Sequence, residues 1–375
     1  MRAEIVERER EALRQAGLDA LVASSPENFA YTTGFVAPSQ PLMRWRHAMS
    51  VVTADGASAL LVVDMEESTV RSKAPDDEVR VWGEFTDDPI RVLAELLGAK
   101  GLARSRIGLE MSYLPAGDFE RLRRLAPEAT FAPADALFDR MRQIKTADEI
   151  ALLRKLSRIA DEAIAEALLG VEAGMTEMDI ASLLTRGIYG RGSEYFKLMI
   201  VATGERSEYP NVGPTHRELQ NGDLCRVEIF PMIDGYHAGV CRTGVVGDPP
   251  ARAVEIWKNL TECKHLLLDM IKPGADRRAV YDAFLGKFGE LDLPAIDFVG
   301  HGIGLHLHEE PYLGKYSEGV IEEGMVLAIE PLVYGRGMGF GLQNKDMLVV
   351  TEGGCELLSD RTDTDFLVRV GPARS

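Results

Sequence analysis

Two stretches of this 375-residue chain repeat one pattern, which limits the folds open to its second part. In each stretch a long amphipathic helix is predicted to end at a glycine turn, and a second helix follows directly. The turn glycines, Gly174 and Gly274, lie 100 residues apart, and strand-rich segments come after both helix pairs. Such a duplication predicts two related halves of helices and strands, with a ligand site in the cleft between them.

The first part of the chain alternates between predicted helices and short apolar strands, which indicates a separate α/β unit of about 140 residues. Thr146 and Glu149 then form the signature of a capping box, in which each side chain accepts from the other residue's backbone N–H. A long amphipathic helix over residues 150–169 is predicted to follow. We therefore expect one domain over residues 1–143 and a second over residues 144–375.

The charge balance excludes two classes of partner. Lysine and arginine number 42 and aspartate and glutamate 59, which gives a net charge of −17. This excess repels nucleic-acid phosphates and anionic lipids, so we expect neither nucleic acid nor a membrane as partner. No apolar run approaches the ~18–20 residues that span a bilayer, and the four cysteines lack the CxxC spacing of zinc or redox sites. We expect a cytoplasmic protein.

One stretch, residues 300–311, concentrates imidazoles. His301, His306 and His308 lie within eight residues of each other, between glycines that let the backbone approach a ligand closely. A single histidine is usually structural, but three in a glycine-rich segment indicate a site.

Two carboxylates complete the candidate chemistry. Glu330 ends an apolar strand, where a carboxylate is costly unless it is functional or paired. Glu228 lies in a predicted strand and shares a face with Arg226 by alternation. A substrate-binding acid and a structural ion pair with Arg226 are both compatible with that position.

The order of these motifs resembles the pita-bread family of creatinase, Xaa-Pro dipeptidase (prolidase) and aminopeptidase P. The resemblance is carried by GHGIGLHLHEEP, by a Glu-Pro after EEGMVLAI, by the closing D-x-L-x-V-T-x-G-G and by the domain entry IKTADEI. The segment NFAYTTGF is similar to the amino-domain signature of creatinases and Xaa-Pro dipeptidases, so the resemblance covers the whole chain. It implies a two-domain α/β protein: a small α/β amino-terminal domain of the creatinase/prolidase type and a pita-bread α+β domain with a pseudo-twofold repeat.

Peptidases of this family hold two metal ions with Asp, Asp, His, Glu and Glu side chains, and this chain departs from that pattern. His301 and Glu330 match the histidine and the first glutamate, and Glu228 replaces the first aspartate. The two bridging acids correspond to Gly239 and Lys345, and an ammonium there repels a nearby cation by several kcal/mol at short range. The resemblance thus implies no cofactor, with a single divalent ion on Glu228, His301 and Glu330 as the alternative.

Creatinase is the metal-independent branch of the family, and Phe230–Ile233 with Gly235-Tyr236 resembles its sequence. The leading hypothesis is therefore a creatinase-like hydrolase that cleaves a C–N bond, of amide or amidine type, in a small zwitterionic or cyclic substrate without metal. Asn211 stands at the position of creatinase's catalytic histidine, and Cys241 at that of a substrate-binding glutamate. Creatine itself is therefore not the expected substrate.

Under this hypothesis His301 or His308 acts as general acid/base, with help from Glu330, because imidazoles titrate near neutral pH. His237 is a second candidate base. The expected substrate-binding residues are Glu228 for a cation, Lys345 and Arg46 for a carboxylate, and in addition His237, Asn211, Tyr236 and Trp45.

A loop of the first domain bears on assembly. In creatinase an aromatic and arginine loop reaches into the partner subunit's site, and residues 43–46, with Arg44, Trp45 and Arg46, occupy the matching stretch. The resemblance implies a homodimer in which residues 44–46 reach the partner's site and bind a substrate carboxylate. The alternative is a tryptophan packed on its own domain.

Two further functions fit the same residues. The first is an Xaa-Pro dipeptidase or aminopeptidase with an altered metal site, for which His237 or Cys241 could supply a ligand. The second is a catalytically inactive pita-bread module that binds peptides or proteins. A lyase on the same scaffold is a further alternative.

Overall fold

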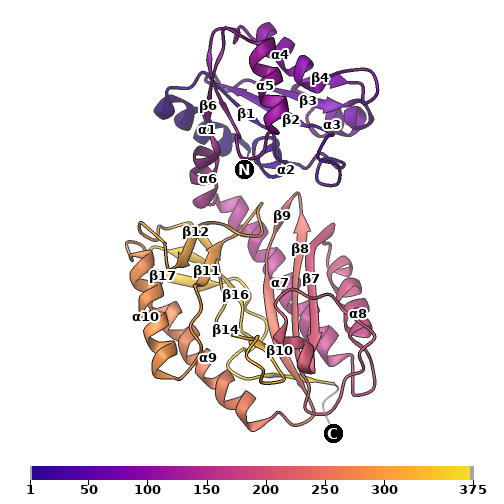
Figure 1. Cartoon of the computed structure of the whole chain (residues 1–375), viewed down its shortest axis with the longest axis vertical. Coiled ribbons are helices and arrows are strands. Elements are labelled where there is room, and N and C mark those ends of the chain that lie inside the picture. Colours follow the sequence, from indigo (N-terminus) through magenta and orange to yellow (C-terminus); the bar gives the residue numbers. More distant parts are fainter. Residues whose placement is uncertain (1, 372–375) are drawn as a thin grey trace. The chain divides into compact units, whose positions relative to one another are not determined.

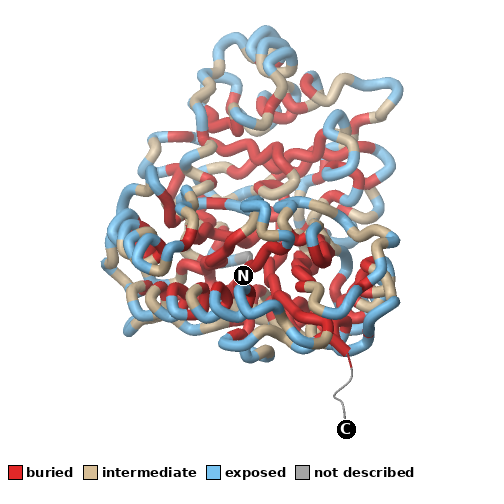
Figure 2. The backbone as a smooth tube through the Cα atoms, turned by 60° about the horizontal axis from the view of Figure 1, so that its bottom comes forward, coloured by how far each residue is buried: buried red, intermediate tan, exposed pale blue. Residues whose placement is uncertain are grey.

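The structure, a computed structural model, describes residues 2–371. The chain divides into two compact units, one that extends to Arg142 and one that begins at Gln143. Within the described residues, no helix is long and apolar enough to cross a membrane. In Figure 2 the buried segments follow the strands of the sheets, whereas exposed segments follow connections and outer faces of helices.

The first unit is a six-stranded mixed sheet covered by helices (Figure 1). The strand order is β4-β3-β2-β1-β5-β6, and β1 pairs antiparallel with β2 but parallel with β5. The strands are β1 (Ala20–Ala23), β2 (Met49–Thr53), β3 (Ser58–Val63), β4 (Glu78–Trp82), β5 (Arg106–Leu109) and β6 (Thr130–Pro133). The helices are α1 (Arg2–Ala16), α2 (Pro26–Thr33), α3 (Glu67–Lys73), α4 (Pro89–Ala99), α5 (Ala116–Leu125) and α6 (Asp135–Gln143), with a 3₁₀ turn at Asp64–Glu66.

Strand β3 shows why this sheet needs cover on both faces. Its side chains alternate between two apolar clusters: Leu61 and Val63 pack with α4, while Leu60 and Val62 pack with Phe29 of α2. Successive strand residues point to opposite faces, so a strand that is apolar throughout must be buried on both sides.

The two-domain α/β architecture predicted from the sequence is confirmed.

The second unit contains two five-stranded sheets and a two-stranded ribbon. One sheet has the order β18-β10-β8-β7, with β9 pairing β8, and the other has the order β12-β11-β13-β16-β17. The first comprises β7 (Tyr195–Thr203), β8 (Leu224–Ile233), β9 (Tyr236–His237), β10 (Val240–Val246) and β18 (Val368–Val370). The second comprises β11 (Phe298–Gly302), β12 (Glu309–Gly314), β13 (Val326–Ile329), β16 (Asp346–Thr351) and β17 (Gly354–Leu357); the ribbon is β14 (Leu332–Val333) with β15 (Leu342–Gln343).

Four long helices flank these sheets in two pairs. Helices α7 (Ala147–Leu169) and α8 (Glu177–Gly190) lie on one side of the unit, and α9 (Ala251–Met270) and α10 (Arg277–Glu290) on the other (Figure 1). A further 3₁₀ turn spans Gly204–Glu208. The predicted capping box opens α7: the Thr146 hydroxyl accepts from the Glu149 N–H, and the Glu149 carboxylate accepts from the Thr146 N–H.

The repeat seen in the sequence is reproduced in the backbone. The N–H of Gly174 donates to Leu219 O, and the N–H of Gly274 donates to Ile321 O, both at the turn that joins a long helix to the next. Both glycines have positive φ, 91° and 83°. The two halves of the unit therefore begin with the same helix–turn–helix, which places their sheets in equivalent positions.

Alanine at either turn glycine is expected to destabilise the protein by about 1 kcal/mol, because a Cβ is strained at positive φ. Nothing lies within 4 Å of the added Cβ at Gly174 or Gly274, so the cost is conformational alone. The control is Gly286→Ala at an exposed position of α10, which is expected to stabilise by about 0.5–1 kcal/mol. Urea unfolding of the three variants checks this, and equal effects at all three sites would contradict it.

Candidate active site

Five of the predicted site residues come together in the second unit, although they are carried by separate elements. They are Glu228 in β8, His301 in β11, His308 just before β12, Glu330 just after β13 and Lys345 just before β16. The isolated bridge between Cys241 and Lys345 ties the start of β16 to β10 of the other sheet, so the cluster lies where the two sheets meet.

Lys345 occupies the centre of the cluster. Its Nζ lies 2.9 Å from Glu228 Oε1 and 3.2 Å from Glu330 Oε2, and the residue is 1% exposed. The ammonium also lies 4.9 Å from the centre of the Phe230 ring. Burial opposes its charge, but the two carboxylates outweigh burial and raise the pKa of Lys345.

Glu330 is held as an anion by the same contacts. Burial opposes its ionisation, but the Lys345 ammonium and neighbouring His301 hold the pKa of Glu330 well below its usual range. Gln343 Nε2 donates to Glu330 Oε2 at 3.0 Å. Oxygen Oε2 therefore has two donors, whereas Oε1, the oxygen nearer His301, has no hydrogen-bond partner among the described residues.

His301 faces that free oxygen. Its Nδ1 lies 2.8 Å from the carbonyl oxygen of Gly302, a pure acceptor, so Nδ1 carries a proton and donates it. Its Nε2 lies 3.4 Å from Glu330 Oε1 and also has no hydrogen-bond partner within residues 2–371. The Nε2 of His301 and the Oε1 of Glu330 therefore face one another across a short gap.

His308 stacks on His301 at the outer edge of the cluster. The ring centres are 3.7 Å apart and the planes differ by 16°. Desolvation of the stacked ring, with His301 and Lys345 nearby, lowers the pKa of His308 to about 4, so the ring is neutral at pH 7. Ligand atoms of His301, His308 and Glu330 all lie within 4.8 Å of one another, a grouping that could hold a metal ion.

The side chains do not fit the family's pair of ions. Gly239 offers no ligand, and a Cβ there would lie 2.2 Å from Phe230 Cε1, so the aromatic ring fills the space of an acid at this position. Lys345 places a positive charge between Glu228 and Glu330. A carboxylate would be needed at this position to bridge the family's two ions. His301, His308 and Glu330, by contrast, have the donor types and the free atoms for one ion.

The glycines around His301 have a different role from the one that the sequence suggested. His301 lies within β11, whereas His306 and His308 lie in the connection between β11 and β12. A Cβ on Gly300 would lie 2.9 Å from Ala328 O, and one on Gly302 would lie 2.4 Å from Glu310 O. These glycines allow neighbouring strands to approach closely, and that approach fixes the position of His301.

Two predicted substrate-binding residues of β9 make contacts inside the protein. The Tyr236 hydroxyl donates to Glu149 Oε1 at 2.9 Å, so it ties β9 to the capping box of α7. His237 is fully buried, with Nδ1 3.3 Å from Gly235 O and Nε2 without a partner in the described chain. Asn211 is exposed, in the segment between the 3₁₀ turn at Gly204–Glu208 and β8.

The interpretation of Glu228 as one half of a structural pair with Arg226 is not supported. Arg226 instead donates to Gln343 Oε1 at 3.1 Å and to backbone carbonyl oxygens, including Ser207 O at 3.3 Å. Because Gln343 also donates to Glu330, Arg226 orients the amide that holds this carboxylate. Alternation placed Arg226 and Glu228 on one face but could not identify their partners.

The sequence reasoning missed a second buried pair. Glu309, next to His308, lies 2.8 Å from Lys145 Nζ, and both side chains are almost fully buried. Lys145 is part of the IKTADEI entry motif, so the pair connects the start of the unit to the histidine-rich segment. The lysine next to the predicted start of a long helix was the available signal.

The predicted loop of the first unit makes its own contacts. Arg46 forms a two-point ion pair with Glu84, with Nε–Oε1 at 2.7 Å and NH2–Oε2 at 2.8 Å. Arg44 donates to Tyr113 O at 2.6 Å, while Trp45 is 66% exposed. The homodimer and the reach of residues 44–46 into a partner's site stay predictions.

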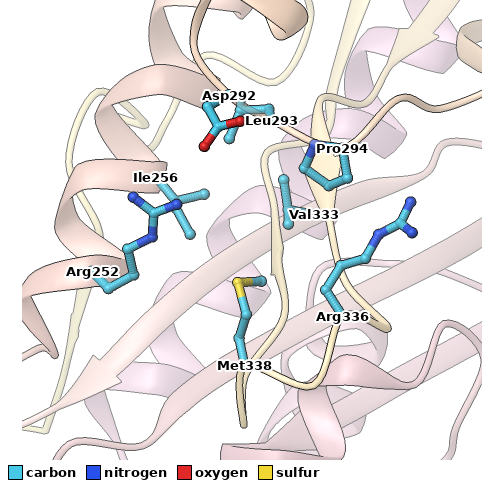
Figure 3. A pocket seen from close by; sticks show the side chains of 8 residues that line it. All are labelled: Arg252, Ile256, Asp292, Leu293, Pro294, Val333, Arg336 and Met338. Carbon is cyan, nitrogen blue, oxygen red and sulfur yellow. The ribbon is translucent and has the colours of Figure 1, made fainter.

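A separate surface cavity of about 310 Å³ lies beside α9 in the second unit. Figure 3 shows Arg252 and Arg336 on opposite sides of it, with Val333 and Met338 between them. Its remaining lining residues are Ile256, Asp292, Leu293 and Pro294. None of the clustered histidines, acids or Lys345 lines this cavity, so it is distinct from the candidate site.

Comparison with known proteins decides the family. The profile described as metallopeptidase family M24 matches residues 151–352, and that of the creatinase/prolidase N-terminal domain matches residues 6–144. The chain belongs to metallopeptidase family M24. A protein named Xaa-Pro dipeptidase from Pyrococcus furiosus is 27% identical over 93% of this chain and 95% of its own length.

Two mycobacterial relatives of this M24 chain agree with that assignment. A protein named probable dipeptidase PepE from Mycobacterium tuberculosis is 31% identical over 92% of this chain and 90% of its own length. The crystal structure of dipeptidase PepE from Mycobacterium ulcerans superposes with a TM-score of 0.82 at 27% identity, and covers 98% of both chains.

These findings correct two predictions. The creatinase-like, metal-independent hydrolase was the wrong leading hypothesis, because relatives that cover the whole chain are named dipeptidases and Xaa-Pro dipeptidases. The expectation of no cofactor was also wrong, because M24 is a family of metallopeptidases and the cluster includes a grouping that could hold an ion. The alternative ligand set also changes: Glu228 is engaged by Lys345, and His308 joins His301 and Glu330 instead.

Buried His237 gives the M24 chain an expected sensitivity to acid. Burial lowers its pKa from 6.5 to about 4. The folded state therefore disfavours the protonated ring, and unfolding takes up a proton between these two pH values. The stabilising contribution is complete above pH 6.5 and falls by about 1.4 kcal/mol per pH unit as the pH decreases toward 4.

His237→Asn is expected to flatten this acid limb, because an amide keeps a donor for Gly235 O without titrating. The matched control is exposed His265, which lies 2.9 Å from Asp365. His265→Asn is expected to leave the slope between pH 6.5 and 4 almost unchanged. Unfolding free energies at half-unit pH steps check this, and parallel curves for wild type and His237→Asn would refute it.

Proposed function

We propose that this protein is a peptidase that hydrolyses dipeptides with proline as the second residue. The observation that carries the proposal is the cluster of His301, His308 and Glu330, in a chain whose first domain matches the creatinase/prolidase N-terminal profile and whose second domain matches the M24 profile. Two archaeal relatives are named Xaa-Pro dipeptidase, and that name supplies the substrate class.

The chain's own residues prepare the site for this reaction. Lys345 and Gln343 keep Glu330 ionised and hold one of its oxygens, which leaves the other directed at His301. The Gly302 carbonyl fixes the His301 tautomer, so Nε2 is available as a ligand. A divalent ion on His301, His308 and Glu330, when bound, would polarise a peptide carbonyl and acidify water.

The test is release of free proline from Leu-Pro and Met-Pro by the purified protein, with zinc, manganese or cobalt supplied separately. Leu-Ala and Met-Ala are the matched controls, since they differ only at the second residue. We expect proline release at least about tenfold faster than alanine release, a difference of about 1.4 kcal/mol in transition-state binding. No release from either series with any ion would overturn the proposal and favour a binding module without peptidase activity.

A further inference from the structure

We propose that a cavity beside His308, formed with the turn after β12, selects a basic side chain, arginine or lysine, at the first residue of the substrate. The proposal rests on the proposed function, since it names which Xaa-Pro dipeptides the peptidase prefers. The cavity has a volume of about 450 Å³ and shares no lining residue with the one beside α9. This volume is within the range of about 300–1,000 Å³ that is usual for small-ligand sites.

The cavity begins one aromatic ring away from the clustered histidines. Phe298 of β11 and Tyr312 of β12 line it, and their ring centres lie 6.0 and 6.4 Å from that of His308. Tyr312 pairs with His301 across the two strands, and paired residues of an antiparallel ladder direct their side chains to the same face. The cavity therefore lies on the face of the sheet that carries the candidate site, and it extends that site along β11 and β12.

The outer wall of the cavity is a turn that the chain's own hydrogen bonds hold in place. The Ser317 hydroxyl accepts from the Gly314 N–H and donates to the Tyr312 carbonyl oxygen, both at 2.8 Å. Lys315 and Tyr316 occupy the turn between Gly314 and Ser317, and both line the cavity. Because the wall is already ordered, little conformational freedom is lost when a ligand binds against it.

Aromatic rings make the cavity suitable for a cation. The side chains of Phe298, Tyr312 and Tyr316 all line it. A guanidinium or ammonium is attracted to the face of an aromatic ring within about 6 Å of the ring centre. The chain already makes such a contact here, because Lys315 Nζ lies 5.5 Å from the centre of the Tyr316 ring. Tyr316 is 86% exposed, so its ring is accessible to a ligand from solvent.

The charged residues favour a cationic ligand over an anionic one. Among the described residues, the lining contains three acids, Asp297, Glu310 and Glu318, and one cation, Lys315. Arg277 lies 3.7 Å from Glu310 and compensates part of its charge, whereas Asp297 and Glu318 form no ion pair within residues 2–371. The remaining negative charge attracts a basic side chain and repels an acidic one. Arginine is expected to be preferred to lysine, because its planar guanidinium both stacks on rings and pairs with carboxylates.

The first experiment compares Arg-Pro with citrulline-Pro, in which a neutral urea group of almost the same shape replaces the guanidinium. The kcat/KM for proline release from Arg-Pro is expected to exceed that from citrulline-Pro by about tenfold, because a cation–π contact and a partly exposed ion pair together contribute about one decade in rate. Glu-Pro is expected to react more slowly than its neutral counterpart Gln-Pro. Equal values for Arg-Pro and citrulline-Pro would overturn the proposal.

The second experiment uses substitutions with opposite expected effects on the preference for Arg-Pro over citrulline-Pro. Asp297→Asn combined with Glu318→Gln is expected to lower that preference to about threefold, because both unpaired carboxylates are lost. Lys315→Met removes the chain's own cation from the Tyr316 ring and is expected to raise the preference by about threefold. The matched control, Glu323→Gln at an exposed acid outside the cavity, is expected to leave it unchanged. Changes of the same sign in the double variant and in Lys315→Met would refute the proposal, because a disturbed turn does not reverse its effect with charge.

The two proposals can fail separately. Proline release from Leu-Pro with no preference for Arg-Pro over citrulline-Pro would retain the peptidase function and remove the selective role of the cavity. If no dipeptide is hydrolysed, calorimetry measures the affinity of the wild-type protein for the same two dipeptides. Binding of Arg-Pro that is about tenfold tighter, a difference of about 1.4 kcal/mol, would retain the cavity as a site for basic side chains, and equal affinities would remove it. Circular dichroism on every variant shows whether a change in preference reflects unfolding, and the two dipeptides test the cavity on the unsubstituted protein.

Discussion

Replacing Lys345 by methionine is expected to lower the free energy of unfolding by about 3–5 kcal/mol in metal-free buffer, because it leaves two buried carboxylates without their shared cation. Methionine retains most of the aliphatic stem, so the change removes the charge more than the packing. The ammonium contacts Glu228 and Glu330 and lies against the Phe230 ring, so no solvent replaces it. Chemical denaturation with a chelator present measures the loss.

A double variant separates the charge from the volume. Lys345→Met with Glu228→Met removes both members of one pair, and an apolar replacement of a buried pair is often neutral. We expect the double variant to regain part of the stability that Lys345→Met loses, because Glu330 still lacks the ammonium. If Lys345→Met alone lowers the free energy of unfolding by no more than about 1 kcal/mol, the usual contribution of a surface ion pair, then Lys345 is solvated in solution.

Removing the imidazole of His301 is expected to reduce the rate of proline release from Leu-Pro by about a thousandfold, since losing several kcal/mol of charge stabilisation corresponds to about three decades in rate. His301 is completely buried and is held by Gly302 O on one side and directed at Glu330 on the other. No other described side chain occupies that position. His301→Ala is therefore more informative than a change at the exposed His308.

The matched control is His306→Ala, because His306 is also in the histidine-rich segment but lies outside the cluster, and its backbone carbonyl accepts from the Gly304 N–H. We expect its kcat/KM for Leu-Pro to stay within about threefold of wild type, a change of less than 1 kcal/mol. A similar loss in both variants would indicate that the segment, and not the His301 imidazole, supports the reaction.

Local sequence patterns were sufficient to predict the elements and the family. The hydroxyl–carboxylate pair of Thr146 and Glu149 fixed the start of α7, because a capping box is satisfied within four residues. The glycines at 174 and 274 predicted two equivalent turns, because positive φ at a helix end favours glycine. The motif residues around His301 and Glu330 identified the M24 fold for the same reason: each motif is a continuous stretch of sequence.

The partners of the charged residues were decided by the tertiary structure. The sequence placed Lys345 at the position of a bridging acid, but only the meeting of β8, β13 and β16 shows that its ammonium lies between Glu228 and Glu330. Similarly, Gly239 was a missing ligand in the sequence, whereas in the structure Phe230 fills the space beside it. The contact between Lys345 and Glu228 joins residues more than a hundred positions apart, and local propensity carries no information on distances across sheets. The approach of His301 Nε2 to Glu330 Oε1, at 3.4 Å, follows from that packing alone.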